Sequence, residues 1–239
     1  MRHTARFPSI CVDGFYSNPY EIIEWAASLD YDVDPRSAWP GSRTVPLSRI
    51  DPTFDEQFSK RLLGMFFDID RDWVSWEIQS HFQIIKPFSD DKNDPRNWGW
   101  IHQDSDGVYD PVKGFEPLKC EYAGIIYLTP DADLDTGTSI FRAKTDGEPN
   151  KDQPLKQELF RNEEVDPSEY AKNMLESRSQ FEETIRYCNV FNRLIAFEAH
   201  NYHAAMNFKM NSDKIRLTQV FFIRNIRTQV NPLLRGFLR

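Results

Sequence analysis

The stretch that decides the fold runs from Trp73 to Ile85 and reads WVSWEIQSHFQII. It is rich in aromatic and β-branched residues, and its apolar residues partly alternate with polar ones, which predicts a β-strand. Shorter segments of similar character follow it, at 100–104, 122–128, 137–142, 190–197, around 203 and at 215–223. Such a run of short strands predicts an antiparallel sandwich or jelly roll.

After a possible short strand at Ile10–Phe15, the first 70 residues predict mainly helices. One helix is expected to begin at Asn18-Pro19-Tyr20-Glu21, with an asparagine cap and a capping box, and to continue to about Leu29. A second is expected from Asp51, because phenylalanine and leucine recur at helical spacing after it. Residues 31–50 contain several prolines and predict an irregular loop. The predicted fold class is therefore mainly β with flanking helices (α+β).

A charged segment interrupts the predicted strands. Residues 145–183 lack strand character, and Asp166-Pro167-Ser168-Glu169 within them predicts the start of a helix. The segment has too few apolar residues for a core of its own. We therefore predict one domain over 1–239, made of the parts 1–70 (helical and loop support), 73–144 with 188–223 (jelly-roll core) and 145–187 (a partly helical insert or lid).

Composition argues against several classes of partner and of structural site. The chain has 239 residues and a net charge of −8, which argues against nucleic acid as a partner because phosphate binding needs clustered basic residues. The cysteines, Cys11, Cys120 and Cys188, are widely spaced and predict buried free thiols, not disulfides or a zinc site. No signal peptide and no stretch of 18 apolar residues is present, so a soluble cytoplasmic protein without a membrane partner is expected.

The tripeptide His102-Gln103-Asp104 is the main candidate for chemistry. Two residues apart on a strand, His102 and Asp104 would project to the same face and could bind one metal ion. Two imidazoles and one carboxylate leave coordination positions open, which suits non-haem Fe(II) that must also bind a cosubstrate and O2. His200 and His203 both remain candidates for the second imidazole, whereas His81 is expected to be an ordinary buried polar residue.

The surroundings of this tripeptide strengthen the prediction. Six short segments occur in a fixed order, WIHQD (100–104), GIIYLTP (124–130), GTSIF (137–141), NRLIAF (192–197), YHA (202–204) and RLTQVFF (216–222). Over residues 80–223 this order resembles the 2-oxoglutarate/Fe(II)-dependent dioxygenase superfamily, and within it the prolyl-4-hydroxylase-like branch. The resemblance implies a double-stranded β-helix, a jelly roll with the metal in its mouth.

The resemblance also implies roles for individual residues. The catalytic metal ligands would be His102, Asp104 and His203, with His203 preferred over His200 because it follows the NRLIAF segment at the expected distance. Arg216 would bind the distal carboxylate of 2-oxoglutarate through its planar fork of donors.

Other implied contacts are less specific. Thr218 could add a hydroxyl donor to the same carboxylate, and Tyr127 could hydrogen-bond the cosubstrate or simply belong to the core. Gln83 and Arg142 are further candidates for substrate contact, a surface position being the alternative for Arg142.

The function implied is that of an oxygenase. Fe(II), 2-oxoglutarate and O2 would hydroxylate a C–H bond and release succinate and CO2, and the retained Asp104 favours hydroxylation over halogenation. The alternatives are a non-catalytic jelly-roll binding module and a cupin-like metalloenzyme that does not use 2-oxoglutarate; Arg216 argues against the latter. A peptide, an amino acid or another small molecule would all be compatible as substrate.

Overall fold

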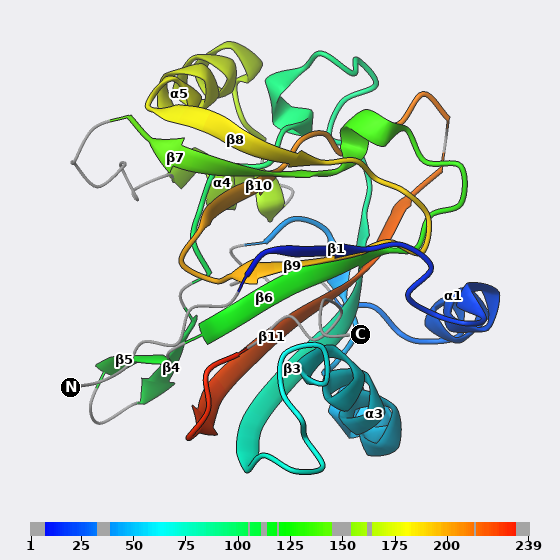
Figure 1. Ribbon diagram of the computed structural model, residues 1–239. Helices are drawn as coiled ribbons and strands as arrows, with labels where there is room; N and C mark the ends of the chain where they lie inside the picture. The colour runs from blue at the N-terminus through cyan, green and yellow to red at the C-terminus, as the bar shows by residue number, and fades with distance from the viewer. Residues whose placement is uncertain are drawn as a thin grey trace.

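Two antiparallel sheets form the framework of the protein (Figure 1). The computed structural model describes residues 8–32, 39–104, 106–110, 114–118, 120–144, 154–161, 164–212 and 214–232. The larger sheet has six strands in the order β1 (Ile10–Val12), β9 (Leu194–Glu198), β6 (Cys120–Tyr127), β11 (Arg216–Thr228), β3 (Val74–Ile85) and β2 (Ser42–Arg43). The smaller sheet has the order β10 (Tyr202–Ala205), β7 (Thr138–Ala143) and β8 (Phe181–Tyr187). The predicted α+β class with a jelly-roll core is confirmed.

Helices cover the outer face of the larger sheet. The helices of the first part of the chain are α1 (Pro19–Ala27), α2 (Leu47–Ile50) and α3 (Pro52–Leu63). Phe58 and Leu62 of α3 join Phe82 of β3 and Phe221 of β11 in one buried cluster, and the rings of Phe58 and Phe221 are 5.1 Å apart. Because side chains alternate along a strand, the neighbours of Phe82 and Phe221 point to the opposite face, between the sheets.

The helix starts predicted from the sequence are confirmed only in part. Asp51 caps α3 as expected, since its carboxylate accepts hydrogen bonds from the backbone of Thr53 and Phe54. Asn18 precedes α1 but makes no side-chain cap, so the predicted capping box is wrong. The predicted loop at 31–50 is also partly wrong, because it contains β2 and α2. Residues 33–38 of that loop lie outside the described chain.

The charged segment supplies two helices and, unexpectedly, a strand. The helices are α4 (Pro154–Phe160) and the predicted α5 (Pro167–Ser179); α5 lies above the smaller sheet in Figure 1, whereas α4 is seen below β7. The insert was predicted to extend to residue 187. This end is wrong, because β8 (Phe181–Tyr187) pairs with β7 and so belongs to the smaller sheet. Within the described chain β8 has a neighbour on one side only. Most of its side chains are exposed and several of these are charged, so its sequence lacks the apolar alternation that marks a strand.

The remaining described elements are short. A hairpin of β4 (Asp106–Asp110) and β5 (Gly114–Leu118) was not predicted, and two 3-10 turns are η1 (Pro95–Asn97) and η2 (Leu134–Thr136). Cys120 is a buried free thiol as expected, but Cys11 is exposed, since it lies on the edge strand β1. Within the described chain, no helix has both the length and the apolar character that crossing a membrane requires.

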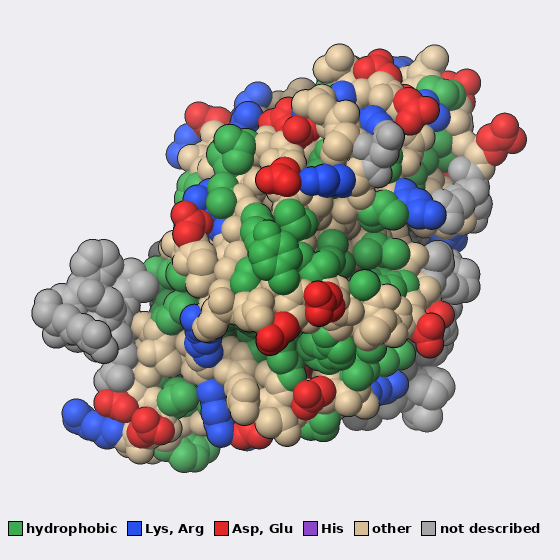
Figure 2. All heavy atoms as spheres, turned by 90° about the vertical axis from the view of Figure 1, so that its right-hand side faces the viewer, with side chains coloured by type: hydrophobic (Ala, Val, Ile, Leu, Met, Phe, Trp, Pro, Cys, Tyr) green, Lys and Arg blue, Asp and Glu red, His purple; other side chains and the backbone are tan. Residues whose placement is uncertain are grey.

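The side of the molecule that bears α1 presents hydrophobic side chains near its centre, with acidic and basic side chains around them (Figure 2). Tyr20 of α1 is exposed, with its ring centroid 5.3 Å from that of Phe191. No histidine of the described chain is visible on this face. The candidate histidines therefore do not open toward it.

Candidate metal centre

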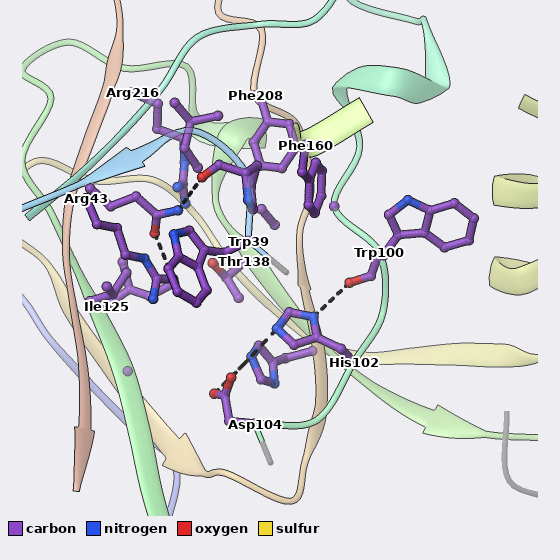
Figure 3. Close-up of a pocket in the computed structure, with 18 of the residues that line it drawn as sticks. Trp39, Arg43, Trp100, His102, Asp104, Ile125, Thr138, Phe160, Phe208 and Arg216 are labelled. Carbon is purple, nitrogen blue, oxygen red and sulfur yellow. Dashed lines mark hydrogen bonds and ion pairs between the residues drawn. The ribbon is translucent and has the colours of Figure 1, made fainter. Parts of the chain in front are cut away.

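His102, Asp104 and His203 converge on one point at one end of the space between the sheets (Figure 3). Each offers one ligand atom, and the three atoms lie within 4.8 Å of one another. Nε2 of His203 is 3.3 Å from one oxygen of Asp104, and Nε2 of His102 is 3.7 Å from the other. Two imidazole nitrogens and one carboxylate oxygen in this arrangement fit a divalent transition metal with open coordination positions.

The backbone holds the two histidines opposite each other. The N–H of His102 donates to the carbonyl of His203 over 3.0 Å, and the N–H of His203 donates back over 2.9 Å. The predicted strand at 100–104 is wrong in extent, because this segment makes only an isolated bridge with β10. Its other backbone bonds reach Ala205 from Gly99 and Ala199 from Asp104. The spacing of the ligands is thus set by main-chain pairing.

Each imidazole is oriented by a carbonyl two residues before it. Nδ1 of His102 is 2.8 Å from the carbonyl oxygen of Trp100, and Nδ1 of His203 is 2.9 Å from that of Asn201. A carbonyl can only accept, so each Nδ1 carries a hydrogen, and Nε2 is the ring nitrogen left to bind a metal ion. Such outer hydrogen bonds fix the tautomer that a metal ion needs.

The pKa values of the three residues also favour metal binding. Burial lowers the pKa of His102 to about 3, so this imidazole is neutral at physiological pH. Burial would raise the pKa of Asp104, but neighbouring His203 outweighs it and the net pKa lies below the usual range. Burial would lower the pKa of His203, yet the Asp104 carboxylate raises it overall. A metal ion would therefore take the place of a proton shared by His203 and Asp104.

His200 takes no part in this cluster. It is exposed, and its backbone carbonyl accepts a hydrogen bond from the Gln103 side chain over 2.6 Å. Of the two histidines left open by the sequence, His203 is the one beside Asp104.

The cluster lies in a pocket that Arg216 also lines. Including its open mouth, the space measures about 730 Å³. Arg216 is 2% exposed, and the only side-chain hydrogen bond it makes within the described chain is a long one of 3.4 Å from Nε to the carbonyl of Thr136. Nη2 has no partner, and no described carboxylate lies within ion-pair distance. A buried charge of this kind is costly unless an anion pairs with it.

Three hydroxyl groups are buried near this end of the fold without a well-formed hydrogen bond, and two of them, those of Thr138 and Tyr127, are close enough to interact with each other. They belong to Thr138, Thr218 and Tyr127. Thr138 of β7 lines the pocket with Arg216, whereas Thr218 and Tyr127 do not; they face each other across β11 and β6. Burial raises the pKa of Tyr127 to about 12, so its hydroxyl remains a donor. Contacts of Thr218 and Tyr127 with a cosubstrate remain predictions.

The structure adds pocket residues that the sequence did not indicate. Besides Thr138 these include Trp39, Arg43 and Lys156, which belong to no motif. Gln83 lines the pocket as suggested and donates to the carbonyl of Pro40 over 2.6 Å. Arg142, in contrast, is a surface residue paired with Glu182 at 2.7 Å.

Comparison with known families assigns the chain to one of them. Residues 2–223 match the model of a family described as "Family of unknown function (DUF6445)". The chain belongs to this family. A search of curated protein sequences gives no significant match to this DUF6445 chain.

Solved structures resemble the DUF6445 chain in fold. HygX from Streptomyces hygroscopicus, with nickel, 2-oxoglutarate and hygromycin B bound, is 15% identical, with a TM-score of 0.51 over 92% of this chain and 83% of HygX. SnoK, a non-heme alpha ketoglutarate dependent carbocyclase from nogalamycin biosynthesis, is 11% identical, with a TM-score of 0.51 over 96% of this chain and 85% of SnoK. At such identities the likeness shows the shared jelly-roll fold.

Proposed function

We propose that the protein is an Fe(II)- and 2-oxoglutarate-dependent oxygenase that hydroxylates a C–H bond of its substrate. One observation carries the proposal: the buried guanidinium of Arg216, with no carboxylate partner in the described chain, lines the same pocket as His102, Asp104 and His203. A dicarboxylate cosubstrate that chelates a metal ion at one end needs a cation at the other end. The order of the sequence motifs supports the prolyl-4-hydroxylase-like branch, and the shared fold agrees with the wider class.

The residues would act as follows. His102, Asp104 and His203 would hold Fe(II), which supplies activation of O2 and oxidation of the substrate. Asp104 offsets part of the ionic charge, and the carbonyls of Trp100 and Asn201 keep both imidazoles in the ligating tautomer.

Arg216 would bind the distal carboxylate of 2-oxoglutarate through two parallel hydrogen bonds, which fixes its position and angle. The Thr138 hydroxyl is available as a further donor in the same pocket. Apolar side chains such as Phe197 and Phe222 line the remaining wall and would limit access of water. An enzyme that uses a metal without a dicarboxylate cosubstrate has no need of a buried arginine that lacks a carboxylate partner in the described chain.

A spectroscopic titration tests the proposal. Anaerobic protein mixed with Fe(II) and 2-oxoglutarate should show the weak visible charge-transfer band of the chelate. His203→Ala should abolish the band because one of three ligands is lost, whereas His200→Ala, the matched control, should retain it. Absence of the band in protein that circular dichroism shows to be folded would overturn the proposal.

A further inference from the structure

Helix α4 brings a lysine into the pocket of the metal centre. Lys156 lines this pocket together with the three candidate ligands, and so does Phe160, one helical turn later (Figure 3). Residues four apart lie on the same face of a helix, so α4 turns this face toward the pocket. The helix lies in the charged segment at 145–183, which contains none of the six sequence motifs.

The ammonium group of Lys156 lacks a partner in the described chain. The side chain is half-buried, and it makes no hydrogen bond and no ion pair with described residues. Its Nζ is 5.9 Å from the ring centroid of Phe160. Burial lowers the pKa of this ammonium, and the carboxylate of Asp104 opposes the effect. Asp104 is the only acid among the described lining residues, and a bound metal ion would occupy it.

The charge of Lys156 acts on the metal end of the pocket. Burial lowers the pKa of His102, and the charges of His203 and Lys156 lower it further. Burial is also the largest effect on the pKa of His203; Asp104 outweighs it, and Lys156 makes a smaller contribution that lowers the pKa. Arg216 is not among the main causes of either shift. The pocket therefore has one cation near the ligands, Lys156, besides the one proposed to bind the distal carboxylate, Arg216.

We propose that Lys156 binds the carboxylate of 2-oxoglutarate that adjoins its oxo group. A 2-oxo acid chelates a metal ion through the oxo group and one oxygen of this carboxylate, so the second carboxylate oxygen stays free to accept a hydrogen bond. The Lys156 ammonium is an unpaired donor at that end of the pocket, and a charge-assisted hydrogen bond would pair it. The proposal rests on the proposed function, because it needs 2-oxoglutarate in this pocket.

Two 2-oxo acids that differ only at the far end test the assignment. Anaerobic protein loaded with Fe(II) is titrated with 2-oxoglutarate and with 2-oxopentanoate, which lacks the distal carboxylate, and the visible band reports binding. Lys156→Met should weaken both ligands by a similar factor, on the order of tenfold. Arg216→Met should weaken 2-oxoglutarate and change the affinity for 2-oxopentanoate little. Lys172→Met, which removes an exposed lysine of α5, should change neither.

The position of the band distinguishes direct contact from an effect on the fold. A positive charge beside the chelating carboxylate stabilises the electron that the charge-transfer transition moves onto the ligand. In Lys156→Met the band should therefore move to shorter wavelength. Lys156→Arg keeps a cation, so it should shift the band less and retain most of the affinity. The affinity for Mn(II) alone should not fall in Lys156→Met, because a charge that repels the ion is removed.

The outcomes separate this proposal from the proposed function. If the wild type forms no band, the proposed function fails, and the role of Lys156 fails with it. If the band forms and Lys156→Met changes neither its position nor the two affinities, only the role of Lys156 fails. Loss of affinity for 2-oxoglutarate alone would place Lys156 at the distal carboxylate and overturn the assignment. Weaker Mn(II) binding in Lys156→Met would mean that α4 had been displaced, which also overturns it.

Discussion

The surroundings of Arg216 indicate a role in binding and not in stabilising the fold. Its guanidinium is buried, has one long hydrogen bond and has no carboxylate partner in the described chain. A structural arginine would be paired, because desolvation of an unpaired charge costs several kcal/mol. The folded chain therefore accepts a destabilising charge that becomes favourable only when an anion binds.

Arg216→Met tests this reading. The variant keeps much of the volume but removes the charge, so the free energy of unfolding without ligand should stay the same or rise. Affinity for 2-oxoglutarate should fall on the order of 100-fold, because a buried charge pair is lost. Urea unfolding and 2-oxoglutarate titration measure the two effects. A destabilised variant with unchanged affinity would contradict the assignment.

The sequence could identify the ligands but not the whole pocket. His102, His203 and Arg216 lie in short motifs whose order is informative, so they could be predicted. Arg43 and Lys156 could not, because they reach the pocket only through the packing of β2 and α4 around it. No local pattern distinguishes them from the other basic residues of the chain.

At the scale of elements, helix α5 supports the metal centre indirectly. The hydroxyl of Tyr170 on α5 accepts a hydrogen bond of 2.7 Å from the indole of Trp100, and the two rings pack edge to face. The carbonyl of Trp100 in turn orients His102. Arg178 of α5 also donates to the carbonyl of Gly99 over 2.8 Å. The helix therefore holds the segment that carries two of the three ligands.

Tyr170→Phe should reveal this support. The change leaves the buried indole N–H of Trp100 without its partner, which should lower the free energy of unfolding by about 1–2 kcal/mol. Metal affinity should fall severalfold, as measured by titration with Mn(II). The control is Lys172→Gln on the exposed side of α5, which should change neither quantity. Loss of stability without any change in metal affinity would limit Tyr170 to a purely structural role.

The elements differ in how clearly the sequence marks them. β3 is long and rich in aromatic and β-branched residues, so its pattern was recognisable. β8 is a short edge strand with mostly exposed side chains. It pairs with one described neighbour and needs apolar side chains on one face only, so several of its residues are charged. Its identity as a strand depends on pairing with β7, which is distant in sequence and leaves no local signal.

At the scale of the whole molecule, His81 couples stability to pH. It is buried; its Nδ1 is 2.8 Å from the carbonyl of Thr44, and its Nε2 is 2.9 Å from the side-chain nitrogen of Gln79. Both interactions suit the neutral ring, and burial lowers the pKa to about 4 from the ordinary 6.5. Between these values the unfolded chain binds a proton that the native chain does not.

Stability should therefore fall as the pH is lowered from 6.5 to about 4, and this contribution should be constant below and above that window. The loss assigned to His81 is on the order of 3 kcal/mol. Urea unfolding at several pH values, compared between the wild type and His81→Gln, isolates it from other groups. The variant should show a shallower pH dependence in this window; an equal slope in both proteins would refute the role of His81.

Ligands should stabilise the whole fold, since the centre joins both sheets. Fe(II) and 2-oxoglutarate, each at about 100 times its dissociation constant, would add roughly 3 kcal/mol each and about 5 kcal/mol together, which corresponds to a rise on the order of 10 °C in Tm for a chain of this length. Anaerobic calorimetry measures the shift, and a chelator should reverse it. Arg216→Met should keep the shift caused by the metal and lose the part caused by 2-oxoglutarate.

The reciprocal backbone bonds between His102 and His203 have a consequence for how the protein is made. They join positions about a hundred residues apart in the chain, so the entropy of closing that long loop must be overcome before the two imidazoles meet. An unfolded or nascent chain offers only His102 and Asp104 close together, which bind an ion weakly. Acquisition of the proposed metal ion would therefore be a late event in biogenesis, because the polypeptide must reach its native topology before the three ligands meet.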